Sequence, residues 1–232
     1  MSYRSSFYLS ALSVLILCTF CIPVHAYSPG ATQWYEQGHA AIAAGNNTAA
    51  MGAFDQAIVL EPTYFEAWDG KADALNRDGQ FSDALSASDR ALGINPEYVQ
   101  GWINRGQILY NIGYYYEDQK NDLTKANEYY NQQLLAFEKA ISLDPRNTDA
   151  LFNKGYALAG MKRYDEAIAA FDKVKEINPE YPKIDQNKKI AQHLRDQAIP
   201  DYMKFLPVLA MIAVVIIGIV LWSVFLREKK DE

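Results

Sequence analysis

A 34-residue spacing of tryptophan and proline constrains this chain more than any other feature of its sequence. Trp34, Trp68 and Trp102 follow one another at intervals of 34 residues, and Pro62 and Pro96 keep the same interval. A repeat of this length is typical of a solenoid, in which no unit can bury its apolar face alone and each stacks on its neighbours. The middle of the chain is therefore predicted to be a stack of similar units.

The proline phase continues with one interruption. Pro145 and Pro179 are again 34 residues apart, whereas Pro96 and Pro145 are separated by 49 residues, which is one period plus 15. The spacing therefore predicts four units, of which the third carries a 15-residue insertion.

Small and aromatic residues also recur at fixed places within the units. Together with the prolines they resemble the tetratricopeptide-repeat (TPR) pattern, W-x₂-L-G-x₂-Y followed by A-x₃-F-x₂-A and a closing Pro. Ser88 departs from the pattern at the Phe place of the second unit, and Val174 departs from it at a small-residue place of the fourth. The matching residues are Trp34, Gly38, Ala50, Phe54, Ala57 and Pro62; then Trp68, Ala72, Ala84, Ala91 and Pro96; then Trp102, Gly106, Phe137, Ala140 and Pro145; then Leu151, Gly155, Tyr164, Ala167, Phe171 and Pro179.

The resemblance implies an all-α solenoid of about four helix pairs. The Gly and Ala places let two helices approach closely, and Trp, Phe and Tyr fill the space beside them. Gly45 and Gly79 fall at turns between helices, where a positive φ costs glycine little. The predicted segments are a lead at 27–30, repeats at 31–64, 65–98, 99–147 and 148–181, and a polar capping helix at 182–199 that places Ile184, Ile190 and Leu194 on one side.

In the TPR family the first helices of successive units line a concave groove that holds an extended peptide or a partner helix. Asn104 and Asn153 share one place in the third and fourth units, and an amide both donates to and accepts from a peptide backbone. The alternative is that they are ordinary exposed asparagines. Carried over, the groove residues are Tyr35, His39, Asp69, Asp73, Asn76, Asn104, Gln107, Tyr110, Asn153 and Tyr156.

The family's clamp for a C-terminal carboxylate needs lysines and an arginine in this groove. The matching places here hold Tyr35, His39 and Asp69. An acidic tail is therefore not the expected ligand, and a neutral or basic peptide is favoured.

The insertion carries three consecutive tyrosines, Tyr114, Tyr115 and Tyr116. Fifteen residues would lengthen both helices of the third unit by about two turns each, a protrusion of roughly 10 Å. Asp122 or Thr124 offers a cap for the second of these helices. An aromatic projection suits a contact with a partner protein. The alternative is that the tyrosines only hold the two longer helices together.

Apolar segments at both ends predict export and anchoring. Phe7–Val24 follows Arg4 and ends near a cleavage pattern at Ala26, which predicts a signal peptide at 1–26. Residues 205–226 carry no charge, and as a helix this segment is long enough to span a hydrocarbon core of about 30 Å. The tail at 227–232 has three basic residues, which favours a cytoplasmic C-terminus. The expected location is a single-pass cell-membrane protein with extracytoplasmic repeats.

An uncleaved N-terminal segment is the alternative, and it would give a cytosol-facing, tail-anchored TPR receptor. In either topology the chain is predicted to be a non-enzymatic scaffold that assembles other proteins, in the envelope if it is exported. The sequon at Asn46 is a candidate glycosylation site on the exported side.

Composition excludes several other functions. Residues 27–204 contain 18 Lys and Arg against 25 Asp and Glu, a net charge of −7 without a basic stripe, so nucleic acid is not expected as a partner. Both cysteines precede residue 27, and His39 and His193 lack a ligand spacing. We expect no catalytic residue, no metal and no cofactor. The acids Asp69 and Asp73 are interpreted as exposed helix acids and not as a catalytic pair.

Overall fold

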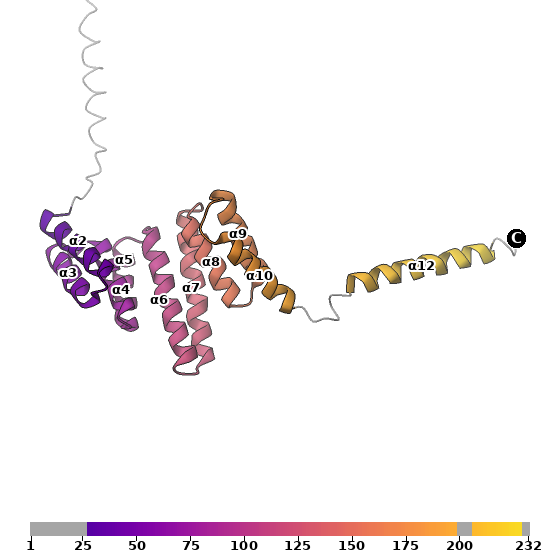
Figure 1. The fold of residues 1–232 in the computed structure, drawn as a ribbon, viewed down its shortest axis with the longest axis horizontal. Helices are drawn as coiled ribbons and strands as arrows, with labels where there is room; N and C mark the ends of the chain where they lie inside the picture. Colours follow the sequence, from indigo (N-terminus) through magenta and orange to yellow (C-terminus); the bar gives the residue numbers. More distant parts are fainter. Residues whose placement is uncertain (1–26, 199–205, 229–232) are drawn as a thin grey trace, which may run out of the picture.

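The computed structural model describes residues 27–198 and 206–228, and these residues form ten helices and no strand. Eight of the helices form four consecutive hairpins (Figure 1). The pairs are α2 (Pro29–Ala43) with α3 (Asn47–Leu60), α4 (Phe65–Arg77) with α5 (Phe81–Ile94), α6 (Val99–Asp118) with α7 (Leu123–Leu143), and α8 (Thr148–Gly160) with α9 (Tyr164–Ile177). Two single helices follow, α10 (Ile184–Ala198) and α12 (Leu206–Glu228).

Local chemistry explains where many of these helices begin. The side chains of Ser28, Asn46, Asp122 and Asn147 each accept a hydrogen bond from the backbone N–H three residues further on. Such a cap satisfies one of the amides that a helix start leaves without a partner. Of the two residues proposed to cap the second helix of the insertion, Asp122 is the one that does so.

The turns inside the hairpins use residues with positive φ. Gly45 and Gly79 have φ of 74° and 80°, as predicted. Asn121 and Lys162 take the equivalent place in the third and fourth hairpins, with φ of 49° and 61°. A lysine in this conformation carries a strain that glycine would avoid.

Buried phenylalanines against small residues form the core of the first, third and fourth hairpins. Phe54 is fully buried, and a Cβ placed on Gly38 or on Gly70 would come within 2.6 Å of its ring. Phe137 and Phe171 have the same relation to Gly106 and Gly155. The small places of the repeat are therefore required by close helix approach, as predicted.

The tryptophans do not fill this core, contrary to the expectation from sequence. Trp34 is 38% exposed, and Trp68 and Trp102 are half-buried. The indole N–H of Trp68 donates to the carbonyl oxygen of Pro62 at 3.0 Å, and that of Trp102 donates to Pro96 at 2.9 Å. This bond at the first two unit junctions explains why tryptophan and proline keep one phase there.

The first helix of each pair lies on the inner side of the stack. Helices α2, α4, α6 and α8 contact one another in succession, whereas no two of the second helices α3, α5, α7 and α9 are in contact. The stack therefore curves toward its first helices, which form the predicted concave side.

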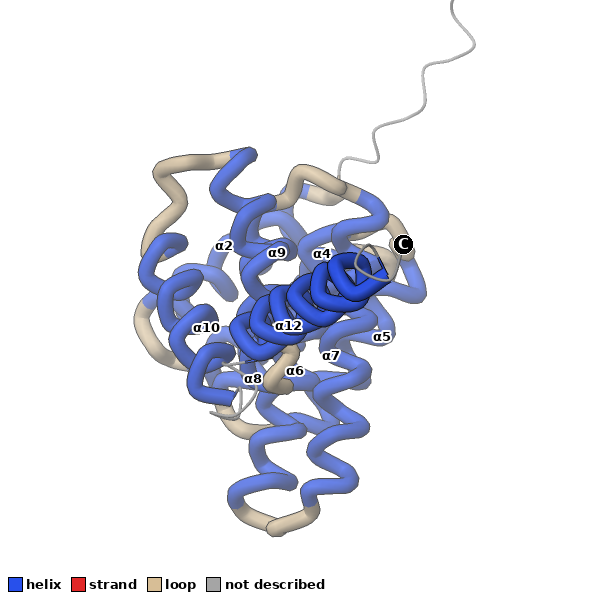
Figure 2. The backbone as a smooth tube through the Cα atoms, turned by 90° about the vertical axis from the view of Figure 1, so that its right-hand side faces the viewer, coloured by secondary structure: helices blue, strands red, loops and turns tan. Residues whose placement is uncertain are grey.

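The 15-residue insertion lengthens one hairpin. Helix α6 has 20 residues where α4 and α8 have 13, and α7 has 21 where α3, α5 and α9 have 14. Each is thus longer by about two turns, and the hairpin extends beyond its neighbours (Figure 2). The rings of Tyr116 and Tyr129 stack across it with centroids 5.4 Å apart.

Helix α10 closes the stack by packing on α9, with Ile184 only 3% exposed. Ile190 and Leu194 were expected on the same apolar side, but they are 50% and 36% exposed. This helix therefore buries one part of its apolar surface and leaves another part open.

Helix α12 makes no contact with any other described helix. Among the described residues, no helix meets the combined length and apolarity needed to cross a membrane. The transmembrane helix expected at 205–226 stays a prediction. The signal peptide at 1–26 lies outside the described residues, as do residues 229–232 of the tail.

Candidate binding groove

Six of the ten predicted groove residues lie together around one cavity of about 360 Å³ on the inner side of the stack. Helices α4, α6, α7 and α8 supply its walls, and most of the lining side chains are polar. The six are Asp73, Asn76, Gln107, Tyr110, Asn153 and Tyr156, and the structure adds Arg77, Asn111, Gln133 and Phe137. We call this the amide cavity.

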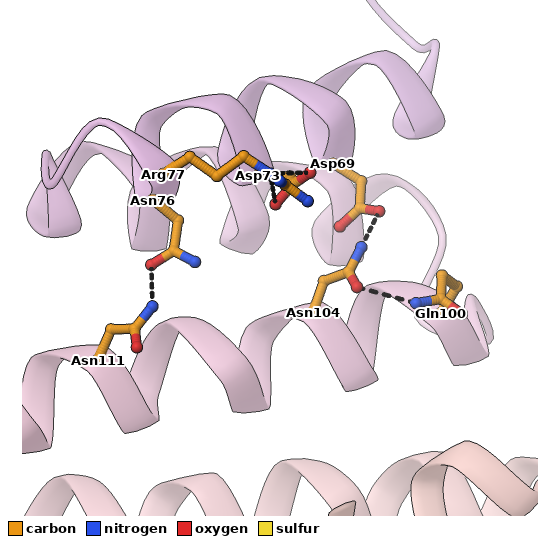
Figure 3. A network of polar contacts seen from close by, with 7 residues as sticks. All are labelled: Asp69, Asp73, Asn76, Arg77, Gln100, Asn104 and Asn111. Atoms are coloured by element: carbon orange, nitrogen blue, oxygen red, sulfur yellow. Dashed lines mark hydrogen bonds and ion pairs between the residues drawn. The ribbon is translucent and has the colours of Figure 1, made fainter. Parts of the chain in front are cut away.

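The polar groups of the amide cavity are partly paired with one another. The side-chain amide of Asn111 donates to Asn76 Oδ1 at 2.9 Å, which joins α6 to α4 (Figure 3). Arg77 Nε donates to both carboxylate oxygens of Asp73 at 2.9 Å. The guanidinium of Arg77 is therefore paired within its own helix.

Asp69 is buried, so its interpretation as an exposed groove acid is wrong. Only 4% of this residue is exposed, and the structure places it between α4 and α6. Asn104 Nδ2 donates to Asp69 Oδ2 at 2.6 Å, and the hydroxyl of Tyr98 donates to the same oxygen at 3.3 Å. Asn104 Oδ1 accepts from Gln100, so both ends of this amide are engaged within the protein.

Asn104 is therefore part of the junction between the second and third units, in contrast to the role predicted for it as a peptide-binding amide. Its repeat equivalent Asn153 is half-buried and lines the amide cavity. Two asparagines at one place of the repeat thus have different surroundings, because only the second unit offers a buried carboxylate to the helix that follows.

Burial dominates the electrostatics of Asp69. It raises the pKa of the Asp69 carboxyl to about 6, although the hydrogen bonds from Asn104 and Tyr98 act in the opposite direction. Nearby Asp73 and Glu66 raise it further. The second oxygen, Oδ1, is buried and has no hydrogen-bond partner among the described residues.

Tyr35 and His39 lie apart from the amide cavity, on α2 at the N-terminal end of the stack. The Tyr35 ring contacts His39 and Tyr64 with centroids 4.5 and 5.0 Å away, and burial raises its pKa to about 12. His39 is exposed. These two residues thus belong to an aromatic cluster at the first unit.

A second and larger cavity, of about 440 Å³, lies where the elongated hairpin meets α8 and α10. Tyr110, Gln133 and Tyr156 line both cavities, so the two are adjacent. We call it the apolar cavity. Its other lining residues are Tyr114, Glu117, Tyr130, Ala157, Ala159, Gly160, Met161, Phe171, Asn187, Ile190, Ala191 and Leu194.

Of the three insertion tyrosines, one lines the apolar cavity and two pack elsewhere. Tyr114 is 52% exposed and lines the cavity. Tyr116 stacks on Tyr129, and Tyr115 packs near Phe81 of α5 with ring centroids 6.2 Å apart. Two of the three therefore hold helices together, and one faces a site.

Sequence reasoning missed the contributions of α7 and α10 to these cavities. Gln133 lies on a second helix, which the repeat pattern assigns to the outer layer, and it stands at the place that Ala50, Ala84 and Ala167 hold in the other units. Its longer side chain lines both cavities. Ile190 and Leu194 looked like cap core residues. Their spacing of four matches one helix face, but it does not say whether that face is covered.

The remaining predicted site residues are described briefly. Asn46 is exposed and caps α3, with Oδ1 accepting from the N–H of Ala49 at 3.0 Å. His193 is exposed on α10. Within residues 27–198 and 206–228 no cluster of His, Cys, Asp or Glu is arranged to hold a metal ion.

Comparison with known families supports the repeat interpretation. Two family models described as tetratricopeptide repeat match the sequence, one at residues 35–99 and one at residues 148–181. None of the curated proteins matches the chain. The chain thus contains TPR repeats in its first two units and its fourth, and the elongated third unit lies between the two matches.

Solved structures of low sequence identity share the fold. TTC0263, a thermophilic TPR protein of Thermus thermophilus, superposes with a TM-score of 0.60 at 20% identity, over 69% of this chain and 80% of its own. MamA of Desulfovibrio magneticus RS-1 gives 0.54 at 18% identity, over 74% and 94%. YrrB, a TPR protein with an unusual peptide-binding site, gives 0.52 at 18%, over 72% and 79%. The repeats and the fold point to a protein-interaction repeat protein and not to an enzyme.

Proposed function

We propose that this protein is a scaffold that binds a peptide or helix of a partner protein in the groove formed by α4, α6 and α8. The observation that carries the proposal is the amide cavity, in which side chains from three successive units converge. Gln107 is exposed there, and within the described part of the chain Asn153 has no side-chain hydrogen bond that would compete with a ligand. Side-chain amides can donate to and accept from a peptide backbone whatever its side chains are.

The ligand is a neutral or basic segment. Among the residues that line the amide cavity, Arg77 is held by Asp73, so the cavity offers no separate cation to an acidic tail. YrrB, which has a similar fold, is described as having a peptide-binding site. That description concerns YrrB, and it supports here only the use of this fold for peptides.

Photocrosslinking in native cells tests the proposal. A photoreactive residue at Gln107 is expected to capture a defined partner, and Asn153→Ala should lower the yield. A photoreactive residue at Gln56, exposed on the second helix α3, is the matched control on the outer layer. Equal capture from Gln107 and Gln56, or a crosslinking yield that Asn153→Ala does not change, would exclude the groove as the binding surface.

We further propose that the repeats are exported and held at a membrane by the segment at 205–226. Two features support this, the signal-like segment at 1–26 and the 22 uncharged residues of 205–226. The large apolar side chains between Val208 and Ile219 are also exposed, which is unfavourable in water. The alternative is a cytosol-facing receptor with an uncleaved N-terminal segment.

Sequencing the N-terminus of the membrane-extracted protein decides between these topologies. Export predicts a start at Tyr27 and repeats that are digested when protease is added to intact spheroplasts. A retained Met1 with protected repeats would favour the cytosol-facing receptor. Recovery of the full chain in the supernatant after ultracentrifugation would exclude anchoring.

A further inference from the structure

Apolar side chains from three helices surround the apolar cavity without covering one another. Tyr114 on α6, Tyr156 on α8 and Ile190 on α10 are each at least 50% exposed. Leu194 adds a further 36% exposed side chain one turn after Ile190. The volume of about 440 Å³ lies within the range of sites that take a ligand or an anchoring side chain. Open apolar surface of this kind marks a binding site more often than a structural defect.

The elongation of the third unit builds one wall of this cavity. Helix α6 starts at Val99, and its first 13 residues, the full length of α4 or α8, end at Asn111. Tyr114 and Glu117 therefore lie on the added turns. Tyr130 lies opposite them on α7, and its ring is 6.1 Å from that of Tyr110. A hairpin of ordinary length would leave the cavity open on this side.

The charge of the wall is negative. Glu117 is the one residue with a formal charge among those that line the apolar cavity, and its Oε2 accepts a hydrogen bond from the Tyr130 hydroxyl at 2.6 Å. This bond holds the carboxylate at the edge of the aromatic wall. The neighbouring amide cavity contributes only the Asp73–Arg77 ion pair, so Glu117 is the charge that a ligand here would have to match.

We propose that the apolar cavity is an anchor pocket for one apolar side chain of the bound peptide, and that Glu117 selects a lysine or arginine next to that anchor. The proposal deepens the proposed function, because it requires a peptide whose backbone continues into the amide cavity. Tyr110, Gln133 and Tyr156 line both cavities, so one extended segment can occupy them together.

Two glycines provide a matched test. Gly160 lines the apolar cavity at the end of α8, and a Cβ built on it meets no atom within 4 Å. Gly93 on α5 has equally open surroundings and lines neither cavity. Gly160→Leu therefore adds a large side chain at the wall of the apolar cavity, and Gly93→Leu adds the same side chain elsewhere. Neither position requires positive φ, so both variants should fold.

The probe is a set of short, end-capped peptides of Asn, Ser and Gly that carry one Leu followed by one Lys. Binding to the full chain, kept in solution with an amphipathic polymer, is measured by fluorescence polarisation. Replacing the Leu by Ser should weaken binding by about tenfold or more, because burial of one such side chain is worth at least that factor. Gly160→Leu should weaken binding of the Leu–Lys peptide by about tenfold, and Gly93→Leu should leave it within about twofold.

Glu117 is tested by exchanging the peptide charge. Changing the Lys to Glu should weaken binding about threefold or more to the wild type, and Glu117→Gln should remove that preference. A Leu–Lys peptide that does not bind, or that binds equally to Gly160→Leu, would overturn the anchor pocket. The proposed function would still stand if a photoreactive Gln107 captured its partner in the Gly160→Leu variant.

Disulfide crosslinking tests whether α12 or a second copy of the chain occupies the apolar cavity. With Cys18 and Cys21 changed to Ser, the pair Leu194→Cys and Val215→Cys reports on α12 as an occupant. A disulfide within one chain would assign the pocket to the protein's own α12, and one between two chains would assign it to a second copy. Either result would overturn the proposal. The expected result is no crosslink.

Discussion

At the residue scale, Asp69 departs from the residue type that the other units have at its place. One period before and after it, the same place holds Tyr35 and Ile103, and in the fourth unit it holds Phe152. A carboxylate buried at this apolar place loses its hydration. Within the described chain, only Oδ2 of Asp69 accepts hydrogen bonds in exchange, from Asn104 and Tyr98. The bonds from Asn104 and Tyr98 also tie the second unit to the third, which offsets part of the cost of burying the acid.

The raised pKa of Asp69 predicts a pH-dependent stability. Its folded-state pKa of about 6 lies above its ordinary value of 3.8, so the folded state holds this proton to higher pH than the unfolded state does. The stability that Asp69 contributes therefore falls as pH rises from about 4 to about 6 and is constant above that. Across this window the free energy of unfolding of Asp69→Asn should gain about 2 to 3 kcal/mol relative to the wild type.

Urea denaturation of Asp69→Asn and the wild type at several pH values between 4 and 7 measures this difference. Comparing the two proteins at each pH cancels the titration of the other groups. A difference that does not change with pH would mean that the Asp69 carboxylate is hydrated in the folded protein.

At the element scale, Phe54 lies between two helices that each present a glycine to it. Phe137 and Phe171 each meet one glycine, Gly106 and Gly155, on the first helix of their own hairpin. The second unit has Ser88 at this place, fully buried and with no partner for its hydroxyl among the described residues. The ring of Phe54, from the first unit, packs against Gly70 of the second unit. One aromatic ring therefore contributes to the packing of both units.

Gly70→Ala is predicted to destabilise the fold. The new Cβ would lie 2.6 Å from the Phe54 ring, which is fully buried and has little space to move. Overpacking of this kind costs about 1 to 3 kcal/mol. The control is Gly52→Ala on α3, where the Cβ meets nothing within 4 Å and helix propensity should give a gain of about 0.5 to 1 kcal/mol. Chemical denaturation that ranks the two variants in the opposite order would contradict this packing.

At the scale of the whole molecule, the units share a register of ion pairs across each junction. An acid on a second helix meets a base 16 residues later on the next helix, in Lys71–Asp55, Arg105–Asp89, Lys154–Glu138 and Lys188–Asp172. Each such exposed pair contributes at most about 1 kcal/mol. These pairs align each unit with the next, and the last pair aligns α10 with the fourth unit at the same 16-residue spacing.

The capping helix is predicted to depend on one isoleucine and not on another. Ile184 is 3% exposed and packs in the core of the fourth unit, whereas Ile190 is 50% exposed. Ile184→Ala should cost about 2 to 4 kcal/mol, and Ile190→Ala on the same helix less than about 1 kcal/mol. Thermal unfolding followed by circular dichroism compares the two. Similar losses would mean that α10 covers the apolar cavity more fully than its exposed side chains indicate.

The sequence by itself determined the period, the number of units, the turn glycines and the place of the insertion. These features follow from local chemistry, since helix caps, positive φ and the spacing of small residues act within one or two units. Six of the ten predicted groove residues also lie around the amide cavity, because the repeat sets which face of each first helix turns inward.

Only the tertiary structure decided what happens between units. It buried Asp69, bonded Asn104 to it, and bonded Trp68 and Trp102 to proline carbonyls. It also brought Tyr114 together with Ile190 and Leu194 around the apolar cavity. A residue's exposure depends on what the next unit presents to it, and the length of α6 and α7 changes what reaches α10. The 34-residue period repeats the units but does not carry that information, because the exposed face of each unit is set by its neighbour.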